Sequence, residues 1–272
     1  GVKEIVVSTP AQSIEGLSPE IKYVLKDLGI LEVYLLGGVQ AIGAFVYSGK
    51  VDKIFGPGNA WVTEAKKQVA LSKKCAIDFE AGPSEIAILA DESAHHDFIA
   101  SDLLSQLEHG PDSCALLVTD SKMVAEKVEA SLWKYSRFFG GEKILKGTVL
   151  AVLKKDLHID FLNEFAPEHL SIQTKEPERV MDKIENAGCI FLGSYTPESL
   201  GDYASGTNHV LPTGGEAKFR AGLGVADFFK RINYQKASLS ALQNIGPTVE
   251  ILAEVEGLKA HAFSVALRKG EK

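Results

Sequence analysis

The chain has 272 residues, of which 45% are hydrophobic and 24% are charged, and its formal net charge is -7 at pH 7. This composition is typical of a globular protein that is long enough for one large or two ordinary domains. Acidic and basic residues are interleaved, which excludes a continuous basic surface for nucleic acid. No stretch approaches the roughly 18 apolar residues that a membrane helix needs. We therefore expect a cytoplasmic protein with no nucleic-acid or membrane partner.

The three cysteines, Cys75, Cys114 and Cys189, lie far apart and lack the CxxC spacing of thiolate metal sites. An odd number without a regular spacing does not suggest a disulfide framework either. We interpret them as reduced residues of the core.

Short runs rich in β-branched residues alternate along the chain with longer segments of helical period. The alternation predicts an α/β protein with largely parallel sheets covered by helices. Segments 123–139 and 177–188 are predicted helices. The predicted strands are 4–9, 32–37, 52–57, 85–91, 114–120, 148–153, 170–174 and 189–193.

Breaks in composition divide the chain into three predicted parts. Residues 1–85 read as the remainder of a dinucleotide-binding-like α/β unit, because the chain opens directly in a strand-like run and Gly82 and Pro83 interrupt the pattern. From this opening we expect that an N-terminal part of a longer protein is missing. Residues 86–223 form the second α/β unit, with the metal and catalytic residues, and residues 224–272 a helical extension with Pro247 near a helix start.

The glycine-rich starts of two predicted helices, residues 37–49 and 56–66, leave backbone N–H groups to face an anion or a dinucleotide. Neither matches GxGxxG, and tight helix–sheet turns explain the glycines equally well. His95, His96 and His158 sit among charged residues, and we expect them to be solvated.

The segment from Ser93 to Glu108 reads as a helix that Ser93 caps and the following Gly-Pro ends. Gln106 and His109 stand three residues apart, so both side chains leave the same face of the last turn and can share a ligand. Glu108 points to another face. Alternatively, Gln106 and His109 only hydrogen-bond to the C-terminus of the helix, which explains this spacing about as well.

Glu168 and His169 are adjacent in FAPEHL, directly before a predicted strand. Adjacent residues at a strand entrance point in different directions, so a carboxylate and an imidazole can address two sides of one reacting centre. Their chemistry suits two proton transfers near neutral pH. For an isolated pair, however, a helix-end carboxylate beside a packed histidine is the favoured interpretation.

Residues 193–215 hold five glycines and two prolines among polar side chains, which predicts a long functional loop. Asp202 in this loop is a candidate ligand, with a turn or cap as the alternative, whereas we interpret His209 as a loop anchor. Together with Gln106 and His109, Asp202 and the distant His261 form a nitrogen and oxygen set that zinc accepts. The absence of thiolate favours a working site over a structural one.

Six motifs, in order, carry a resemblance to the histidinol dehydrogenase family over nearly the whole chain: FGPGNAWVTEAK, AGPSE, LLSQLEHGPDS, APEHL, PESLGDYASGTNHVLPT and EGLKAHAFSVALR. The resemblance implies an aldehyde-dehydrogenase-like fold of two α/β units plus a helical C-terminal extension. It also implies an intertwined homodimer in which the extension completes the partner's site. The implied reaction is a two-step, four-electron oxidation of L-histidinol through L-histidinaldehyde to L-histidine, with NAD and one zinc ion per site, in histidine biosynthesis.

The resemblance also implies a role for each matching residue. Glu168 and His169 correspond to the catalytic pair, and Gln40 and Asn59 to NAD contacts. The implied zinc ligands are Gln106, His109, Asp202 and His261. The implied substrate contacts are Ser84, Gln106, His109, His169, Asp202, Glu256 and His261.

The family pattern includes an N-terminal segment that contributes to the NAD pocket and has no counterpart in this sequence. We therefore expect an intact metal shell with impaired NAD binding and turnover. Two other classes of function remain. A zinc-dependent hydrolase would use Glu168 as the base for a metal-bound water, and a metal-binding relative without catalysis would keep only the fold.

Overall fold

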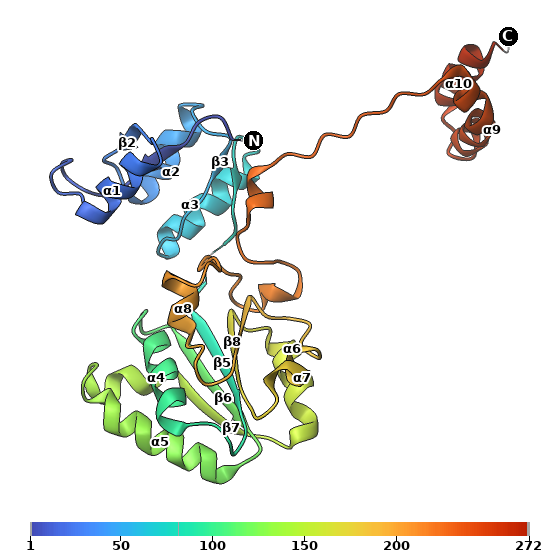
Figure 1. Ribbon diagram of the computed structural model, residues 1–272. Coiled ribbons are helices and arrows are strands. Elements are labelled where there is room, and N and C mark those ends of the chain that lie inside the picture. The colour runs from blue at the N-terminus through green and yellow to red at the C-terminus, as the bar shows by residue number, and fades with distance from the viewer. Residues whose placement is uncertain (1, 81, 271–272) are drawn as a thin grey trace. The chain divides into compact units, whose positions relative to one another are not determined.

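The computed structural model describes residues 2–80 and 82–270 (Figure 1). The chain forms two compact units, Gly1–Phe228 and Phe229–Lys272. The predicted extension, residues 224–272, and the smaller unit contain the same two long helices. Among the described residues, none of the helices combines the length and the apolar character that crossing a membrane requires.

Every strand pair in the larger unit is parallel, so the predicted α/β class with parallel sheets is confirmed. Two sheets have two strands each, β1-β2 and β3-β4, and the third has the order β7-β6-β5-β8-β9. Strand β4 has two residues, which is too short for a sequence pattern to reveal. The strands are β1 Val6–Ser8, β2 Glu32–Tyr34, β3 Lys53–Ile54, β4 Ala76–Ile77, β5 Glu85–Ala90, β6 Cys114–Thr119, β7 Thr148–Val152, β8 His169–Gln173 and β9 Cys189–Leu192.

Helices follow the strands as the alternation predicts. The larger unit contains α1 Pro19–Asp27, α2 Gly38–Tyr47, α3 Ala60–Leu71, α4 His96–Leu107, α5 Lys122–Ser136, α6 His158–Phe165, α7 Pro177–Met181 and α8 Glu198–Tyr203. The smaller unit contains α9 Leu239–Val255 and α10 Lys259–Lys269. Short 3-10 segments are η1 Gly141–Gly147, η2 Lys155–Leu157, η3 Glu216–Lys218 and η4 Val225–Phe228.

The five-stranded sheet contains the main core. Its central strand β5 is buried along its whole length, because β6 and β8 pair with its two edges and helices cover both faces. Ile86 and Ile88 pack with residues of α4 and α5, whereas Ala87 and Leu89 pack with residues of α6 and α7. These two pairs of helices lie on opposite sides of the sheet (Figure 1). Burying each large aliphatic side chain contributes roughly 1.5–3 kcal/mol.

The strand order decides which residues meet at the amino edge of this sheet. The chain passes from β5 outward to β6 and β7, and then returns to place β8 on the other side of β5. In the β5-β8 register, Ile86 lies opposite His169. Glu85, which begins β5, and the residues that precede the two strands, Ser84 and Glu168, therefore come together although they are far apart in sequence.

Helix α4 begins two residues later than predicted, with His95 and not Ser93 at its N-cap. The physical reason is a turn closed by Asp91, whose Oδ1 accepts the Ser93 N–H at 2.9 Å. The Asp91 carbonyl also accepts the Ala94 N–H at 3.1 Å. Ser93 is therefore used in this turn and cannot cap the helix.

The expectation of solvated histidines is wrong at His158. This side chain is buried at the start of α6, and its Nε2 lies 3.1 Å from the Leu153 carbonyl oxygen. His96 is half-buried and its Nδ1 contacts the Ser131 hydroxyl at 2.9 Å, while His95 is exposed. The charged neighbours in the sequence suggested exposure, and the sequence does not show the contacts that bury these side chains in the folded protein.

In the smaller unit, α9 and α10 pack against each other across a tight turn. Gly257, with φ of 75°, ends α9, and the N–H of Leu258 donates to the Ala253 carbonyl at 2.7 Å. Pro247 lies inside α9 and not near its start, where Ser238 is the cap. The prediction for Pro247 is wrong because α9 tolerates the loss of the one backbone hydrogen bond that an internal proline removes.

Candidate active site at the amino ends of β5 and β8

Glu168 and His169 are both buried at the entrance of β8, and the backbone of Glu85 holds them both. The Glu168 carboxylate accepts the Glu85 N–H at 2.8 Å through Oε2. The His169 Nδ1 lies 3.1 Å from the Glu85 carbonyl oxygen and donates its N–H to it. This bond leaves the proton of the neutral imidazole on Nδ1, so Nε2 can act as a base.

The His169 Nε2 faces Asp202, and no hydrogen bond in the described residues uses it. Its distance to the Asp202 Oδ1 is 3.6 Å, which is longer than a good hydrogen bond. Asp202 lies on the short helix α8, so the segment predicted as an irregular loop is partly helical. The facing His169 imidazole holds the pKa of Asp202 below its usual value, and His109 and His209 lower that pKa further.

Gln106 is fully buried near the end of α4, with 0% of its surface exposed. Neither its amide oxygen nor its amide nitrogen has a hydrogen-bond partner within the described residues. An unsatisfied buried polar atom costs about 1–3 kcal/mol. Such an amide is well suited to a ligand that the protein atoms do not supply.

His109 lies just beyond the end of α4, where it is exposed, and its N–H donates to the Gln106 carbonyl at 3.3 Å. The charge of His109 acts on Asp202, so the fold brings His109 near Asp202 although the two are far apart in sequence. Helices α4 and α8 contact each other. Three of the four predicted ligands, Gln106, His109 and Asp202, therefore lie along one pair of helices.

His261 and Glu256 belong to the smaller unit, where both are exposed at the turn between α9 and α10. Within residues 2–80 and 82–270, no three His, Cys, Asp or Glu side chains form a group that could hold a metal ion. The predicted set contains an amide, and His261 lies in the other unit. Of the predicted zinc ligands, the larger unit therefore contains only two His, Cys, Asp or Glu side chains, His109 and Asp202.

Two buried carboxylates that the sequence analysis missed, Asp102 and Glu198, lie beside these groups. Burial raises the pKa of Glu198 to about 8 and that of Asp102 to about 7. Helical spacing could have revealed both, because Glu198 precedes Asp202 by one turn of α8 and Asp102 precedes Gln106 by one turn of α4. Interpretation of residues 193–215 as a loop concealed the first relation.

The charges of the catalytic pair reflect the same burial. Burial raises the pKa of Glu168 to about 7, with a smaller opposing effect from His169. Burial lowers the pKa of His169, but Asp202, Glu168 and Glu198 outweigh it and raise the pKa to about 9. Carboxyl groups thus outnumber cationic side chains at this edge, and a set of oxygen and nitrogen donors suits a divalent metal ion.

Ser84 directly precedes β5 and is half-buried, and its carbonyl accepts the Cys114 N–H at 3.0 Å. It therefore lies next to Glu85 at the same edge. The cysteines themselves are free thiols, with Cys75 buried and Cys114 and Cys189 partly buried.

The two predicted NAD contacts lie at the starts of helices α2 and α3. Asn59 caps α3, because its Oδ1 accepts the N–H groups of Trp61 and Val62, both at 3.1 Å. Gln40 is exposed in the first turn of α2. The loop before α3 is fixed where Gly56 donates to Asp78 at 2.8 Å. These bonds describe a tight helix–sheet turn, and contact with NAD stays a prediction.

Comparison with known proteins adds to this geometry. The family model described as Histidinol dehydrogenase matches residues 1–269. The chain belongs to the histidinol dehydrogenase family. It is 48% identical over 278 residues to the histidinol dehydrogenase of Vibrio parahaemolyticus, covering 98% of this chain and 64% of that protein. With the enzyme of Methanosarcina mazei the identity is 46%, and the coverage is 99% of this chain and 64% of that protein.

A solved member of the family has the same fold. The crystal structure of histidinol dehydrogenase from Elizabethkingia anophelis superposes with a TM-score of 0.91 at 41% sequence identity, covering 98% of this chain and 64% of that one. The chain therefore spans just under two thirds of the length of these family members.

Proposed function

We propose that the protein carries out the histidinol dehydrogenase reaction, the NAD-dependent oxidation of L-histidinol through L-histidinaldehyde to L-histidine. Family membership supports this proposal at the level of the whole chain. The observation that carries it is the pairing of Glu168 and His169 on the backbone of Glu85, with the His169 Nε2 facing Asp202.

Gln106, His109, Asp202 and His261 would hold a zinc ion. When bound, zinc supplies a positive charge that holds the nitrogen donors of an amino alcohol and orients its carbinol carbon. The unpartnered amide of Gln106 and the surplus of carboxylates support this assignment. Ser84 and Glu256 complete the substrate contacts, with the Glu256 carboxylate suited to a cationic amine.

His169 serves as the base of the first oxidation. Its Nε2 accepts the hydroxyl proton of the substrate. NAD, which Gln40 and Asn59 would help to bind, would supply the acceptor for the hydride of the carbinol carbon. The Glu85 carbonyl fixes the tautomer that makes Nε2 basic. Burial excludes water around this imidazole, so the proton moves within a defined set of groups.

Glu168 serves in the second oxidation, in which water adds to the aldehyde before another hydride leaves. A carboxyl group with a pKa of about 7 is suited to exchange a proton with this water near neutral pH. His169 then accepts the proton of the hydrate. The Glu85 N–H keeps one carboxylate oxygen in place while the other is left for the reaction.

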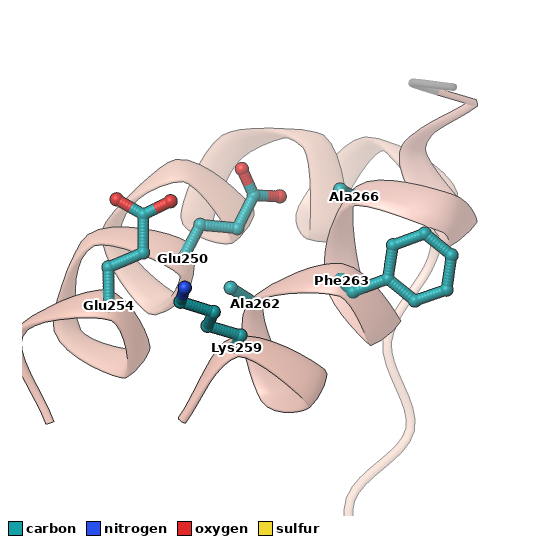
Figure 2. Close-up of a pocket in the computed structure, with 6 residues that line it drawn as sticks. All are labelled: Glu250, Glu254, Lys259, Ala262, Phe263 and Ala266. Carbon is teal, nitrogen blue, oxygen red and sulfur yellow. The ribbon is translucent and has the colours of Figure 1, made fainter. Parts of the chain in front are cut away.

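The smaller unit supports a homodimer, the assembly that we propose for this cytoplasmic enzyme. Its helices expose large apolar side chains, among them Val255, with 81% of its surface exposed, and Phe263, with 62% exposed. A groove of about 550 Å³ runs between α9 and α10 (Figure 2). Its lining residues are Glu250, Glu254, Lys259, Ala262, Phe263 and Ala266. We propose that this unit docks on a second copy and brings His261 and Glu256 to that copy's site.

The test is a stoichiometric oxidation. The zinc-loaded chain is incubated with limiting L-histidinol and excess NAD, and NADH is followed by its absorbance. We expect two equivalents of NADH per histidinol, loss of the reaction on chelation and its return with zinc. An exposed-histidine variant, His95→Gln, is the matched control for His169→Gln.

One equivalent of NADH would indicate an ordinary alcohol dehydrogenase. Metal-dependent ester or amide cleavage without nicotinamide would indicate a hydrolase. Binding of zinc and histidinol without any NADH would leave the metal shell in place but contradict the proposed oxidation by this chain.

A further inference from the structure

Glu198 is a buried carboxylate that the proposed reaction does not use. Only 2% of its surface is exposed. Its Oε1 accepts the Ser105 hydroxyl at 3.0 Å, whereas its Oε2 has no hydrogen-bond partner in the described part of the chain. A buried acceptor that lacks a donor costs free energy, and the fold keeps one here beside its candidate metal site.

Helices α4 and α8 face each other in a defined register. Asp102, Ser105, Gln106 and His109 follow the spacing of one face of α4. Glu198 contacts the beginning of this face, through its hydrogen bond to Ser105 and its interaction with the Asp102 charge. Asp202, one turn further along α8, interacts with His109 at the end of the same face.

Gln106 lies between these two contacts. Its position in α4 follows Ser105 directly and precedes His109 by three residues, so helical spacing places it on the face of α4 that contacts α8. Both of its amide atoms are buried there without a partner. The amide has a donor and an acceptor, Glu198 offers a spare acceptor, and a cation at Asp202 would take an oxygen.

We propose that Glu198 is a positioning residue for the metal ligand Gln106: its Oε2 accepts the Gln106 amide N–H, which directs the Gln106 oxygen to the cation that Asp202 and His109 share. This inference rests on the metal site of the proposed function. It gives a role to the three unpartnered side-chain atoms of Gln106 and Glu198. Outer-shell partners of this kind orient a ligand and increase its basicity.

The experiment measures metal affinity directly, without turnover. The full chain is stripped of metal, and Zn²⁺ and Co²⁺ are titrated in competition with a chromophoric chelator. Glu198→Ala should weaken binding about 10–100-fold, the typical cost of losing an outer-shell partner. Glu198→Gln should stay within about threefold of the wild type, because its amide oxygen can accept from Gln106 while its amide nitrogen donates to Ser105.

Glu198→Gln separates positioning from charge. It removes the negative charge and keeps the acceptor, so a loss as large as that of Glu198→Ala would contradict the inference and indicate general electrostatic attraction. Ser105→Ala is the matched control. It removes the other hydrogen bond of Glu198, and it should change metal affinity less than Glu198→Ala does.

A double-mutant cycle tests whether Glu198 acts through Gln106. In a Gln106→Ala background, Glu198→Ala should cause no further loss of metal affinity. Additive losses, or unchanged affinity in Glu198→Ala alone, would overturn the inference. Thermal unfolding of the metal-free variants detects a merely structural effect, which would lower stability without the expected pattern of metal affinities in this cycle. A wild-type chain that binds neither metal would instead contradict the metal site of the proposed function.

Discussion

At the scale of single residues, the site depends on a backbone group that no motif reveals. Glu85 bonds the side chains of Glu168 and His169 through its N–H and its carbonyl, and this fixes where each proton can go. In its neutral form the imidazole is thereby prepared to accept a proton at Nε2. Glu85 itself is a buried acid whose Oε1 accepts the Gly214 N–H at 2.6 Å.

The first prediction concerns His169. Replacement by Gln removes the base but keeps a group that can bond the Glu85 carbonyl, so kcat should fall about 10²–10⁴-fold, with a smaller change in KM. The measurement is steady-state NADH formation with L-histidinol, with His95→Gln as the control. A kcat within threefold of the wild type would show that another group takes the proton.

The second prediction concerns Asp102, whose pKa burial raises to about 7 from a usual value of 3.8. Well below pH 3.8 the folded and unfolded states both hold the proton, so the group has no effect. As the pH rises from 4 to 7, the unfolded state releases its proton first, and the folded state loses stability. Asp102→Asn should therefore increase the free energy of unfolding at pH 8, by roughly 2–4 kcal/mol.

This effect is measured by urea unfolding of the metal-free chain at pH 4 and pH 8. The exposed Asp112→Asn is the matched control and should change stability by less than about 0.5 kcal/mol at either pH. A stabilisation by Asp102→Asn that is equal at both values would indicate that the titration of this carboxyl is not the cause.

The sequence identified the residues that carry their own signal and missed those defined only by their partners. Glu168 and His169 stand together before a strand, and the structure places both at its entrance. Glu198 and Asp102 each stand one helical turn before a candidate ligand, but only the packing of α4 against α8 shows that both are buried. Burial of His158 was missed for the same reason.

At the scale of elements, the strands of the main sheet were predictable and the short ones less so. Runs such as EIAILA and CALLVT are buried on both faces and contain no turn residues, so their boundaries agree with β5 and β6. Helix ends were harder, because a cap competes with local turns such as the one at Asp91. Helix α8 was missed because its six residues lie within a segment rich in glycine.

The third prediction tests the close approach of β9 to β8. A Cβ atom at Gly188 would lie 2.5 Å from the Glu168 carbonyl oxygen, so the backbone must move to admit it. Gly188→Ala should lower the free energy of unfolding by about 1–3 kcal/mol and displace Glu168. The matched control is Gly43→Ala, in open space within α2, which should increase stability by about 0.5–1 kcal/mol.

Urea unfolding followed by circular dichroism measures both changes. Equal effects of the two substitutions would contradict the tight packing at Gly188. Activity gives a second readout, because a displaced Glu168 should lower the rate of the second oxidation more than that of the first.

At the scale of the whole molecule, the sequence indicated a helical extension over residues 224–272. The structure places the division between its two units at Phe228. A pattern within one chain cannot tell which copy a tail serves, because two copies of the same sequence carry the same signals. The exposed apolar residues of α9 and α10 supply a physical reason for docking, since burying them releases about 25 cal/mol per Å².

The last prediction asks which copy His261 serves. Asp202→Ala and His261→Gln each damage the proposed metal site, so each homodimer alone should lack tight zinc binding. If His261 completes the partner's site, a mixed dimer has one site with both defects and one site with none. Half of the dimers in an equal mixture are mixed, so about a quarter of the wild-type number of tight zinc sites should return after the two variants are unfolded and refolded together.

If His261 serves its own chain, every site in the mixture carries one defect and no tight binding returns. Zinc titration of the refolded mixture distinguishes the two outcomes, and NADH formation provides a parallel count of active sites. Refolded wild-type protein sets the scale. Recovery near one quarter would require that the smaller unit of one chain reach the α4 and α8 face of another, because no single chain in the mixture contains both intact ligands.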